Sequence, residues 1–292
     1  MNEAERQEVL MCFRIAYLAD SEVNWCPALG TVLANDEVKD GLSERGGHPV
    51  MKKTMRQWMM RITAYADRLL SSLDDLDWTD SVKEAQRHWI GRSEGAAVRF
   101  AVANDAGQPD PAGTEVEVFT TRPDTLQGVS FMVLAPEHDL VAGLTSDAQR
   151  AEVEAYVEAA GMKSERDRQG DKSISGVFTG GHVVHPITGA LVPVWIADYV
   201  LAGYGTGAIM AVPAGDERDW RFAKHFELPI PPIFKDVDTQ EAVCTDKGAI
   251  LCNSGEWDGM RASDAIPLAL DWVEAQGCGC LLYTSPSPRD CQ

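Results

Sequence analysis

The sequence contains no long hydrophobic run. None of its stretches approaches the roughly 18 consecutive apolar residues of a membrane-spanning helix. Residues 1–6 (MNEAER), which include two acidic residues, do not have the positively charged start of a signal peptide. We therefore expect no membrane partner and a cytoplasmic location for the chain.

Cysteine is sparse and irregularly spaced. The seven cysteines form no recurring pattern, and Leu29 occupies the position at which a second cysteine would complete a C-x-x-C pair with Cys26. Disulfide frameworks and structural zinc sites both depend on such spacing. We therefore expect reduced thiols and no metal site.

Basic residues are outnumbered by acidic ones. The chain has 26 lysines and arginines against 45 aspartates and glutamates, which gives a formal net charge of −19. This balance excludes a protein that binds nucleic acid over its whole surface. A single basic path to one bound strand is compatible with it.

The pattern of hydrophobic residues changes at about residues 92–95, where we place a domain boundary. Before this point the spacing is mostly helical. The predicted helices cover residues 3–20, 54–72 and 80–89, and two short strands joined by a turn lie within residues 23–33. After it, alternation predicts strands over residues 98–102, 115–119, 129–134, 177–184 and 191–196, and a helix from Ser146 to about Ala160.

Residues 203–226 carry the most informative local pattern. Three glycines within five residues predict a tight loop, and the apolar run Ile209–Val212 predicts a buried strand. Asp216 is the expected N-cap of the next helix, with Asp219 at its third position. Loop, strand and helix together predict a pocket wall with a negative rim. Alternatively, both aspartates only complement the helix dipole, which would stabilise the helix by roughly 0.3 kcal/mol or a little more for each.

A second polar cluster lies at the end of the predicted strand 115–119. Thr120, Thr121 and Thr125 surround Arg122 in the segment TTRPDT. Taken alone, this segment is explained by threonines that favour a strand and by a Pro-Asp turn.

Together, the two segments resemble the editing pocket of leucyl-tRNA synthetases, which are class I aminoacyl-tRNA synthetases. TTRPDT is intact at Thr120–Thr125, and GTGA-hydrophobic-MAVP followed by DxRD is intact at Gly205–Asp219. In that family both motifs belong to the connective-polypeptide insertion. Further similar stretches are VNWCPALG at residues 23–30, ITAYA at 62–66, WIGRSEG at 89–95 and His185-Pro186. The resemblance extends over roughly residues 10–277.

The sequence also departs from this family. The HIGH and KMSKS motifs that hold ATP are absent, and so are the anticodon-binding helices. Gly215 stands where many relatives have a histidine, and residues 278–292 have no family character. We therefore expect a fragment that is truncated at both ends, carries a foreign or misassembled tail and cannot charge tRNA.

The resemblance implies an α/β fold in three parts. Residues 1–92 would be a helical–β remnant of the class I catalytic domain. Residues 93–277 would form the editing domain, a mixed, barrel-like β-sheet with flanking helices, and residues 278–292 would be the tail. ATP and Mg would belong to the full-length parent, so no cofactor is expected in this fragment.

The implied function is post-transfer editing by a leucine–tRNA ligase. The reaction would hydrolyse the ester that joins a wrong amino acid to the 3′ end of tRNA(Leu). Thr120 and Thr121 would hydrogen-bond the ester or the attacking water. Asp219, oriented by Asp216, would pair with the α-ammonium group of the substrate.

The other site residues would determine which substrate fits. Thr125 would limit the size of the pocket and so reject leucine, and Arg122 would meet the terminal phosphate. The pocket for the amino-acid side chain would be lined by Tyr204, Met210 and Val212.

Two other functions are open at this point. A non-catalytic tRNA-docking module would have the same fold without hydrolysis. A carboxylate metallohydrolase would use Asp216, Asp219 and a histidine. However, His182 and His185 are three residues apart on a predicted strand and so face opposite sides of it.

Overall fold

The computed structural model describes residues 2–39, 41–91, 93–104, 106–161, 163, 168, 173–202 and 205–284. The chain divides into two compact units, one formed mainly by Met1–Ser93 and the other by Glu94–Tyr283. Each unit is described by itself. In the described part of the chain, no helix has the length and apolar character needed to cross a membrane.

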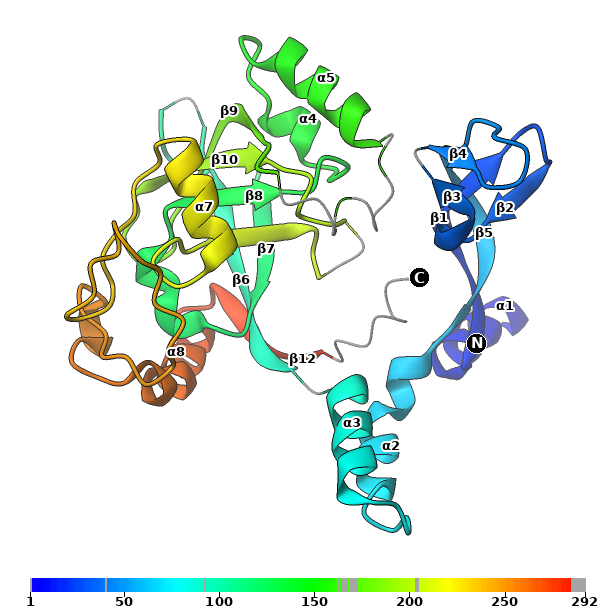
Figure 1. The fold of residues 1–292 in the computed structure, drawn as a ribbon, viewed down its shortest axis with the longest axis horizontal. Helices are drawn as coiled ribbons and strands as arrows, with labels where there is room; N and C mark the ends of the chain where they lie inside the picture. The colour runs from blue at the N-terminus through cyan, green and yellow to red at the C-terminus, as the bar shows by residue number, and fades with distance from the viewer. Residues whose placement is uncertain are drawn as a thin grey trace. The chain divides into compact units, whose positions relative to one another are not determined.

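The first unit is built on a long antiparallel ribbon (Figure 1). Helix α1 (Glu3–Phe13) precedes β1 (Ala16–Cys26), which pairs with β2 (Thr31–Leu33) on one side and with β5 (Met51–Met60) on the other. The remaining elements are η1 (Asn35–Glu37), β3 (Val38–Lys39), β4 (Leu42–Ser43), η2 (Ile62–Tyr65), α2 (Ala66–Ser72) and α3 (Asp80–Ile90).

Two predicted helices of this unit are partly wrong. Residues 16–20 belong to β1, and the segment predicted to be helical from residue 54 is instead the strand β5 as far as Met60. The ladder between β1 and β5 runs without a break from Ala16 opposite Met60 to Trp25 opposite Met51, so it satisfies both backbones. This long-range pairing outweighs the helical spacing that begins at Trp58, whose side chain is 72% exposed.

The second unit is organised around one mixed sheet (Figure 1). Its described strands follow the order β11-β8-β10-β9-β6-β12, and β7 also pairs with β6. Their bounds are β6 (Ser93–Val102), β7 (Glu115–Thr120), β8 (Phe131–Leu134), β9 (Val177–Val184), β10 (Leu191–Ile196), β11 (Ala208–Ala211) and β12 (Gly279–Thr284). The predicted α/β fold with a mixed sheet and flanking helices is confirmed, although the described strands do not close into a barrel.

Helices flank this sheet. They are η3 (Pro123–Gly128), α4 (Val141–Leu144), α5 (Arg150–Gly161), α7 (Glu217–His225), η4 (Gly255–Trp257) and α8 (Ala262–Ala275). The strands expected at residues 177–184 and 191–196 are confirmed. The helix expected after Ser146 begins only at Arg150, and the short α4 before it was not predicted.

Part of the expected tail lies at the edge of the sheet. Gly279–Thr284 forms β12 beside β6, and the backbone N–H of Arg99 donates to the carbonyl of Cys278 at 2.8 Å. An edge strand pairs through its backbone, whatever its side chains are. The pairing is therefore compatible with a foreign segment, and that origin stays a prediction. Residues 285–292 lie outside the described residues.

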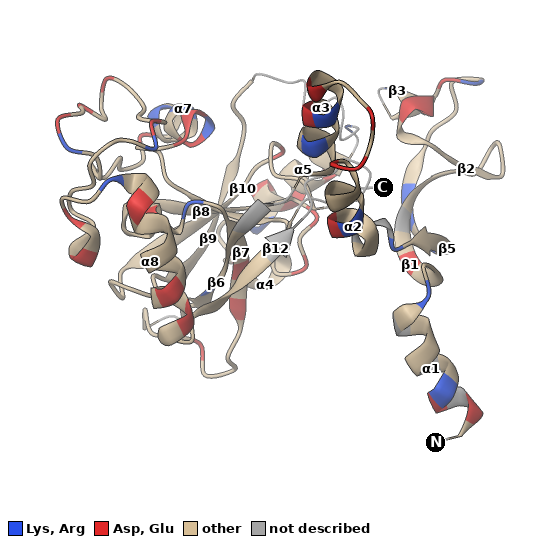
Figure 2. Cartoon of the chain, turned by 90° about the horizontal axis from the view of Figure 1, so that it is seen from below, with Lys and Arg blue, Asp and Glu red and all other residues tan. Residues whose placement is uncertain are grey.

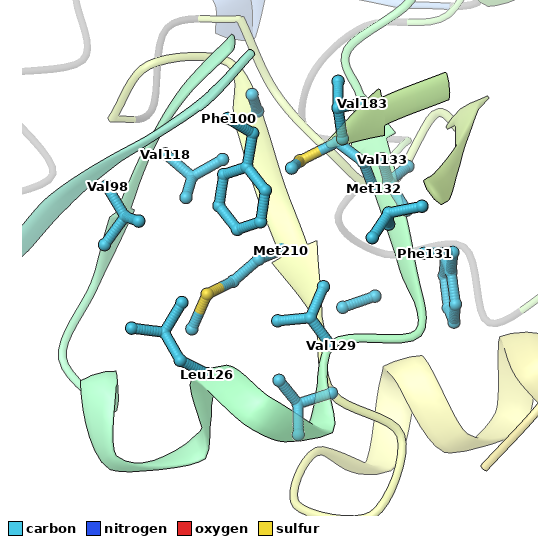
Figure 3. Packing of buried hydrophobic residues seen from close by; sticks show 14 of the residues in the cluster. Val98, Phe100, Val118, Leu126, Val129, Phe131, Met132, Val133, Val183 and Met210 are labelled. Atoms are coloured by element: carbon cyan, nitrogen blue, oxygen red, sulfur yellow. The ribbon is translucent and has the colours of Figure 1, made fainter. Parts of the chain in front are cut away.

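The core lies between the sheet and the helices that flank it, among them η3 and α7 (Figures 1 and 3). Phe222 of α7 is 1% exposed and stacks on Phe131 of β8, with 5.2 Å between the ring centroids. The same ring meets Trp195 of β10 edge-on at 5.6 Å and Phe226 at 4.6 Å. Phe222 therefore joins the helix to two neighbouring strands.

We expect Phe222→Ala to lower the free energy of unfolding by about 3–5 kcal/mol, because removal of a buried ring leaves a cavity. Phe13→Ala is the matched control. The Phe13 ring is 81% exposed, so its loss should cost less than about 0.5 kcal/mol. Urea unfolding followed by tryptophan fluorescence measures both values. Equal costs for the two variants would contradict this account of the core.

Candidate functional site

The ladder between β8 and β11 brings the two sequence motifs to the same edge of the sheet. The strands are antiparallel, with Ala211 opposite Phe131, and the N–H of Ser130 donates to the carbonyl of Ala211 at 3.1 Å. The beginning of β8 therefore lies beside the end of β11. The TTRPDT turn leads into β8 through η3, and the segment with Asp216 and Asp219 leads out of β11.

Close packing holds η3 against β11. Leu126 of η3 and Met210 of β11 belong to the same buried cluster (Figure 3). A Cβ atom added at Gly128 would lie only 2.8 Å from Cδ1 of Ile233 and 3.1 Å from Cγ1 of Val212. The backbone of η3 can thus approach the end of β11 because residue 128 has no side chain.

The TTRPDT turn is held by its own side chains. Oγ1 of Thr120 accepts from the N–H of Arg122 at 3.0 Å, and Oγ1 of Thr125 donates to the Arg122 carbonyl at 2.8 Å. The Arg122 guanidinium pairs with Asp124, Nε to Oδ1 at 2.9 Å and Nη2 to Oδ2 at 2.8 Å. Thr121 is exposed, whereas Thr125 is only 3% exposed. The turn therefore has a fixed shape before any ligand arrives.

The ion pair between Arg122 and Asp124 was not predicted from the sequence. We expect Arg122 to meet a phosphate, but its charge is already balanced by the fully buried carboxylate of Asp124. The hydroxyl of Thr125 is used within the turn, as in an ordinary structural threonine. Only its methyl group is left to limit the size of a pocket.

His185 attaches η3 to the turn between β9 and β10, a role that sequence reasoning missed. Its Nδ1 accepts from the N–H groups of Ile187 at 3.1 Å and Thr188 at 3.3 Å, so the ring proton is on Nε2 and is donated to the Leu126 carbonyl at 2.9 Å. Burial lowers the pKa of His185, which keeps the ring neutral.

Among the described residues, no group of three or more His, Cys, Asp or Glu side chains could hold a metal ion.

The helix start at Asp216 is confirmed. Asp216 is the N-cap of α7, and its Oδ1 accepts from the N–H groups of Arg218 at 2.8 Å and Asp219 at 3.2 Å. Asp219 points inward and is 5% exposed. Its Oδ2 accepts from the N–H of Val212 at 2.8 Å, and its Oδ1 accepts from the hydroxyl of Tyr199 at 3.4 Å. Asp219 therefore does more than complement the helix dipole, because it joins α7 to the end of β11.

Burial raises the pKa of Asp219 to about 7, and the charge of Asp216 contributes in the same direction. The N–H of Val212, the charge of Arg218 and the hydroxyl of Tyr199 oppose this shift. Burial, followed by the charge of Asp219, also raises the pKa of Tyr199 well above its ordinary value. The tyrosine therefore stays protonated and acts as a donor.

The residues assigned to the side-chain pocket have different surroundings. Met210 and Val212 are 8% and 6% exposed and belong to the hydrophobic core rather than to an open wall. Their burial agrees with the buried strand that the sequence predicts over Ile209–Val212. Tyr204 lies outside the described residues. The substrate-lining roles of these residues stay predictions.

Comparison with known proteins identifies the family. The family model described as "Leucyl-tRNA synthetase, editing domain" matches residues 87–274, which include both motifs. The chain belongs to this leucyl-tRNA synthetase editing-domain family. The resemblance carried by TTRPDT and by Gly205–Asp219 is thereby confirmed.

Relatives of this editing domain are whole leucine–tRNA ligases. The chain is 54% identical over 288 residues to that of Phocaeicola vulgatus and 52% identical over 288 residues to that of Porphyromonas gingivalis. The alignments cover 95% and 96% of the chain but only 30% of each relative. A similar solved structure is the ternary complex of Agrobacterium radiobacter K84 agnB2 LeuRS with tRNA and LeuAMS. It has a TM-score of 0.66 and 36% identity, and the match covers 97% of this chain and 32% of that one.

Asp219→Asn should flatten the pH dependence of stability. The folded chain holds the Asp219 proton up to about pH 7, whereas the unfolded chain releases it near the ordinary value of 3.8. Between these values the folded state binds more protons, so this carboxyl makes the free energy of unfolding fall as the pH rises. Asparagine can still accept from the N–H of Val212 but does not titrate.

Urea unfolding of both proteins at several values between about pH 4 and 8 tests this expectation. As the pH rises to about 7, the free energy of unfolding of the wild type should fall relative to that of Asp219→Asn. Parallel curves would show that Asp219 is ionised throughout this range.

Proposed function

We propose that this chain contains the post-transfer editing site of a leucine–tRNA ligase, which hydrolyses the ester of a wrong amino acid on the 3′ end of tRNA(Leu). The supporting observation is that the TTRPDT turn leads into the beginning of β8, while the Asp216–Asp219 helix start follows the end of β11 that lies beside it. The whole ligase, of which this chain spans a part, would attach leucine to tRNA with ATP and Mg in the cytoplasm.

A second, hydrolytic site is needed because small apolar side chains are hard to distinguish. One methylene in a hydrophobic pocket is worth only about 1–3 kcal/mol, too little for accurate protein synthesis. The substrate of the editing site has a free α-ammonium group. Asp219 is the carboxylate suited to it, and the positive charge would lower the pKa of Asp219 and keep it ionised.

The threonine turn supplies hydroxyl groups for the ester and the water. Oγ1 of Thr120 accepts one N–H, so its own proton can be donated to an ester oxygen. Thr121 is exposed and can hydrogen-bond the attacking water. Arg122 pairs with Asp124 through Nε and Nη2, so a terminal phosphate would meet its Nη1.

The charge distribution restricts where the tRNA strand can lie. Acidic residues recur along α8, as Figure 2 shows, and Asp264, Asp271 and Glu274 are exposed there. A phosphate backbone would be repelled from that helix. We therefore propose that the 3′ end approaches the threonine turn, where Nη1 of Arg122 is the guanidinium nitrogen that does not bond Asp124.

Asp219→Ala should lower kcat/KM for hydrolysis of norvalyl-tRNA(Leu) by an amount equivalent to about 2–5 kcal/mol, because the ammonium group would lose its partner. Glu217→Ala is the matched control, since Glu217 is an exposed carboxylate of the same helical turn. Deacylation of the mischarged tRNA by the whole chain measures both. Near-normal hydrolysis by Asp219→Ala would contradict the assignment, and no hydrolysis by the wild type would indicate a docking module.

Thr125 offers a test of selectivity that separates bulk from hydrogen bonding. Thr125→Ser keeps the hydroxyl that donates to the Arg122 carbonyl but removes the methyl, whereas Thr125→Val keeps the branched shape without the hydroxyl. We expect the serine variant to hydrolyse correctly charged leucyl-tRNA(Leu) about tenfold faster than wild type, the worth of one methyl group. The valine variant should still reject it.

Deacylation of leucyl-tRNA(Leu) and norvalyl-tRNA(Leu) should be compared for each variant of Thr125. Unchanged rejection of leucine by the serine variant would contradict the proposed role of the methyl group. Loss of norvalyl-tRNA(Leu) hydrolysis in the valine variant alone would show that Thr125 acts through its turn.

A further inference from the structure

Arg168 binds the backbone on both sides of Tyr199. Its side chain is 4% exposed, its Nε donates to the carbonyl of Asp198 at 2.7 Å, and its Nη2 donates to the carbonyl of Val200 at 2.9 Å. Its Nη1 pairs with Glu137 at 2.5 Å, which balances the buried charge. A planar guanidinium that bridges these two carbonyls fixes the orientation of the residue between them.

The same short segment is held from other directions through Asp198. Its Oδ2 pairs with Nζ of Lys163 at 2.7 Å, and its Oδ1 accepts from the hydroxyl of Ser175 at 3.0 Å. Its backbone N–H donates to the hydroxyl of Tyr156 at 3.0 Å. The backbone at Tyr199 is therefore fixed by contacts on both of its neighbours.

Tyr199 directs its hydroxyl to Asp219. Its ring meets Phe222 of α7 edge-on, with 5.9 Å between centroids, and its hydroxyl donates to Oδ1 of Asp219 at 3.4 Å. Asp219 and Phe222 are three residues apart and share one face of α7, so a single side chain can touch both. The phenylalanine supports the ring while the carboxylate receives the proton donor.

We propose that Tyr199 and Arg168 are positioning residues for Asp219. Arg168 fixes the backbone of Tyr199, and the Tyr199 hydroxyl holds the Asp219 carboxylate in the orientation in which it meets the substrate ammonium. The last step rests on the proposed editing function, whereas the placement of Asp219 by Tyr199 does not. Besides Tyr199, the groups facing Asp219 are the N-cap carboxylate of Asp216, the charge of Arg218 and the N–H of Val212.

The proposal makes Asp219 sensitive to the loss of one hydroxyl. A hydrogen bond to a carboxylate favours its ionised form, so removal of the Tyr199 hydroxyl makes Asp219 hold its proton to a higher pH. Tyr199→Phe keeps the ring and its contact with Phe222. Arg168→Lys keeps a positive charge near Glu137 but cannot bridge the two carbonyls. Arg150→Lys is the matched control, because Arg150 is half-exposed and pairs with the exposed Asp147.

The experiment is a pH titration of the Asp219 carboxyl carbon by NMR in the whole chain labelled at aspartate, with Asp219→Asn used for assignment. Tyr199→Phe should raise the titration midpoint by less than about one pH unit, because the lost hydrogen bond is long at 3.4 Å and one unit corresponds to a strong bond to a charged group. Arg168→Lys should shift it in the same direction, and Arg150→Lys should leave it unchanged. An unchanged midpoint in Tyr199→Phe overturns the proposal, even if Arg168→Lys fails to fold.

Hydrolysis of norvalyl-tRNA(Leu) separates this proposal from the proposed function. In Tyr199→Phe the acid limb of the plot of kcat/KM against pH should shift to higher pH together with the midpoint. Activity at high pH should return to within about twofold of wild type. A uniform loss at every pH would overturn the positioning role and indicate a structural one. A shifted midpoint with an unchanged hydrolysis profile would support the placement of Asp219 by Tyr199 but overturn the use of Asp219 in editing.

Discussion

One buried carboxylate joins a strand to a helix at the centre of this fold. Asp219 accepts the N–H of Val212 at 2.8 Å and so connects the end of β11 to the first turn of α7. Burial disfavours the ionised form and raises the pKa to about 7, while the backbone donor offsets part of that cost. The ammonium partner of the proposed function would require the ionised form. Burial of Asp219 therefore favours the protonated form, whereas the proposed role needs the carboxylate. A bound cation would stabilise the carboxylate in its buried position.

The threonine turn shows a different arrangement, in which the polar groups satisfy one another. Asp124 is fully buried, and Arg122 is its ion-pair partner. Removal of that arginine would leave an uncompensated buried charge, which is strongly destabilising. Loss of activity in an Arg122 variant would therefore combine a damaged turn with any lost phosphate contact. Thr121, which is exposed, is the cleaner position at which to examine the chemistry of the turn.

Local patterns predicted the local parts of this structure well. The strands at residues 177–184 and 191–196 alternate, and Asp216 has the chemistry of an N-cap, so neighbours along the chain were sufficient. β5 could not be recognised in this way, because its partner β1 is distant in sequence and a helical spacing begins within its own residues, at Trp58. The inward position of the Asp219 side chain likewise depends on Tyr199, which only the folded chain brings near.

Because Gly128 has no side chain, the core packs closely against η3, and this packing affects the dimensions of the site. A methyl group there would lie 2.8 Å from Ile233 and 3.1 Å from Val212, so either η3 or the end of β11 would have to move. The threonine turn leads into η3, and Asp219 is bonded to Val212. The packing at Gly128 therefore determines how far the threonine turn lies from Asp219. In the proposed editing site, substitutions in the core beside Gly128 would change which substrate fits without contacting the substrate themselves.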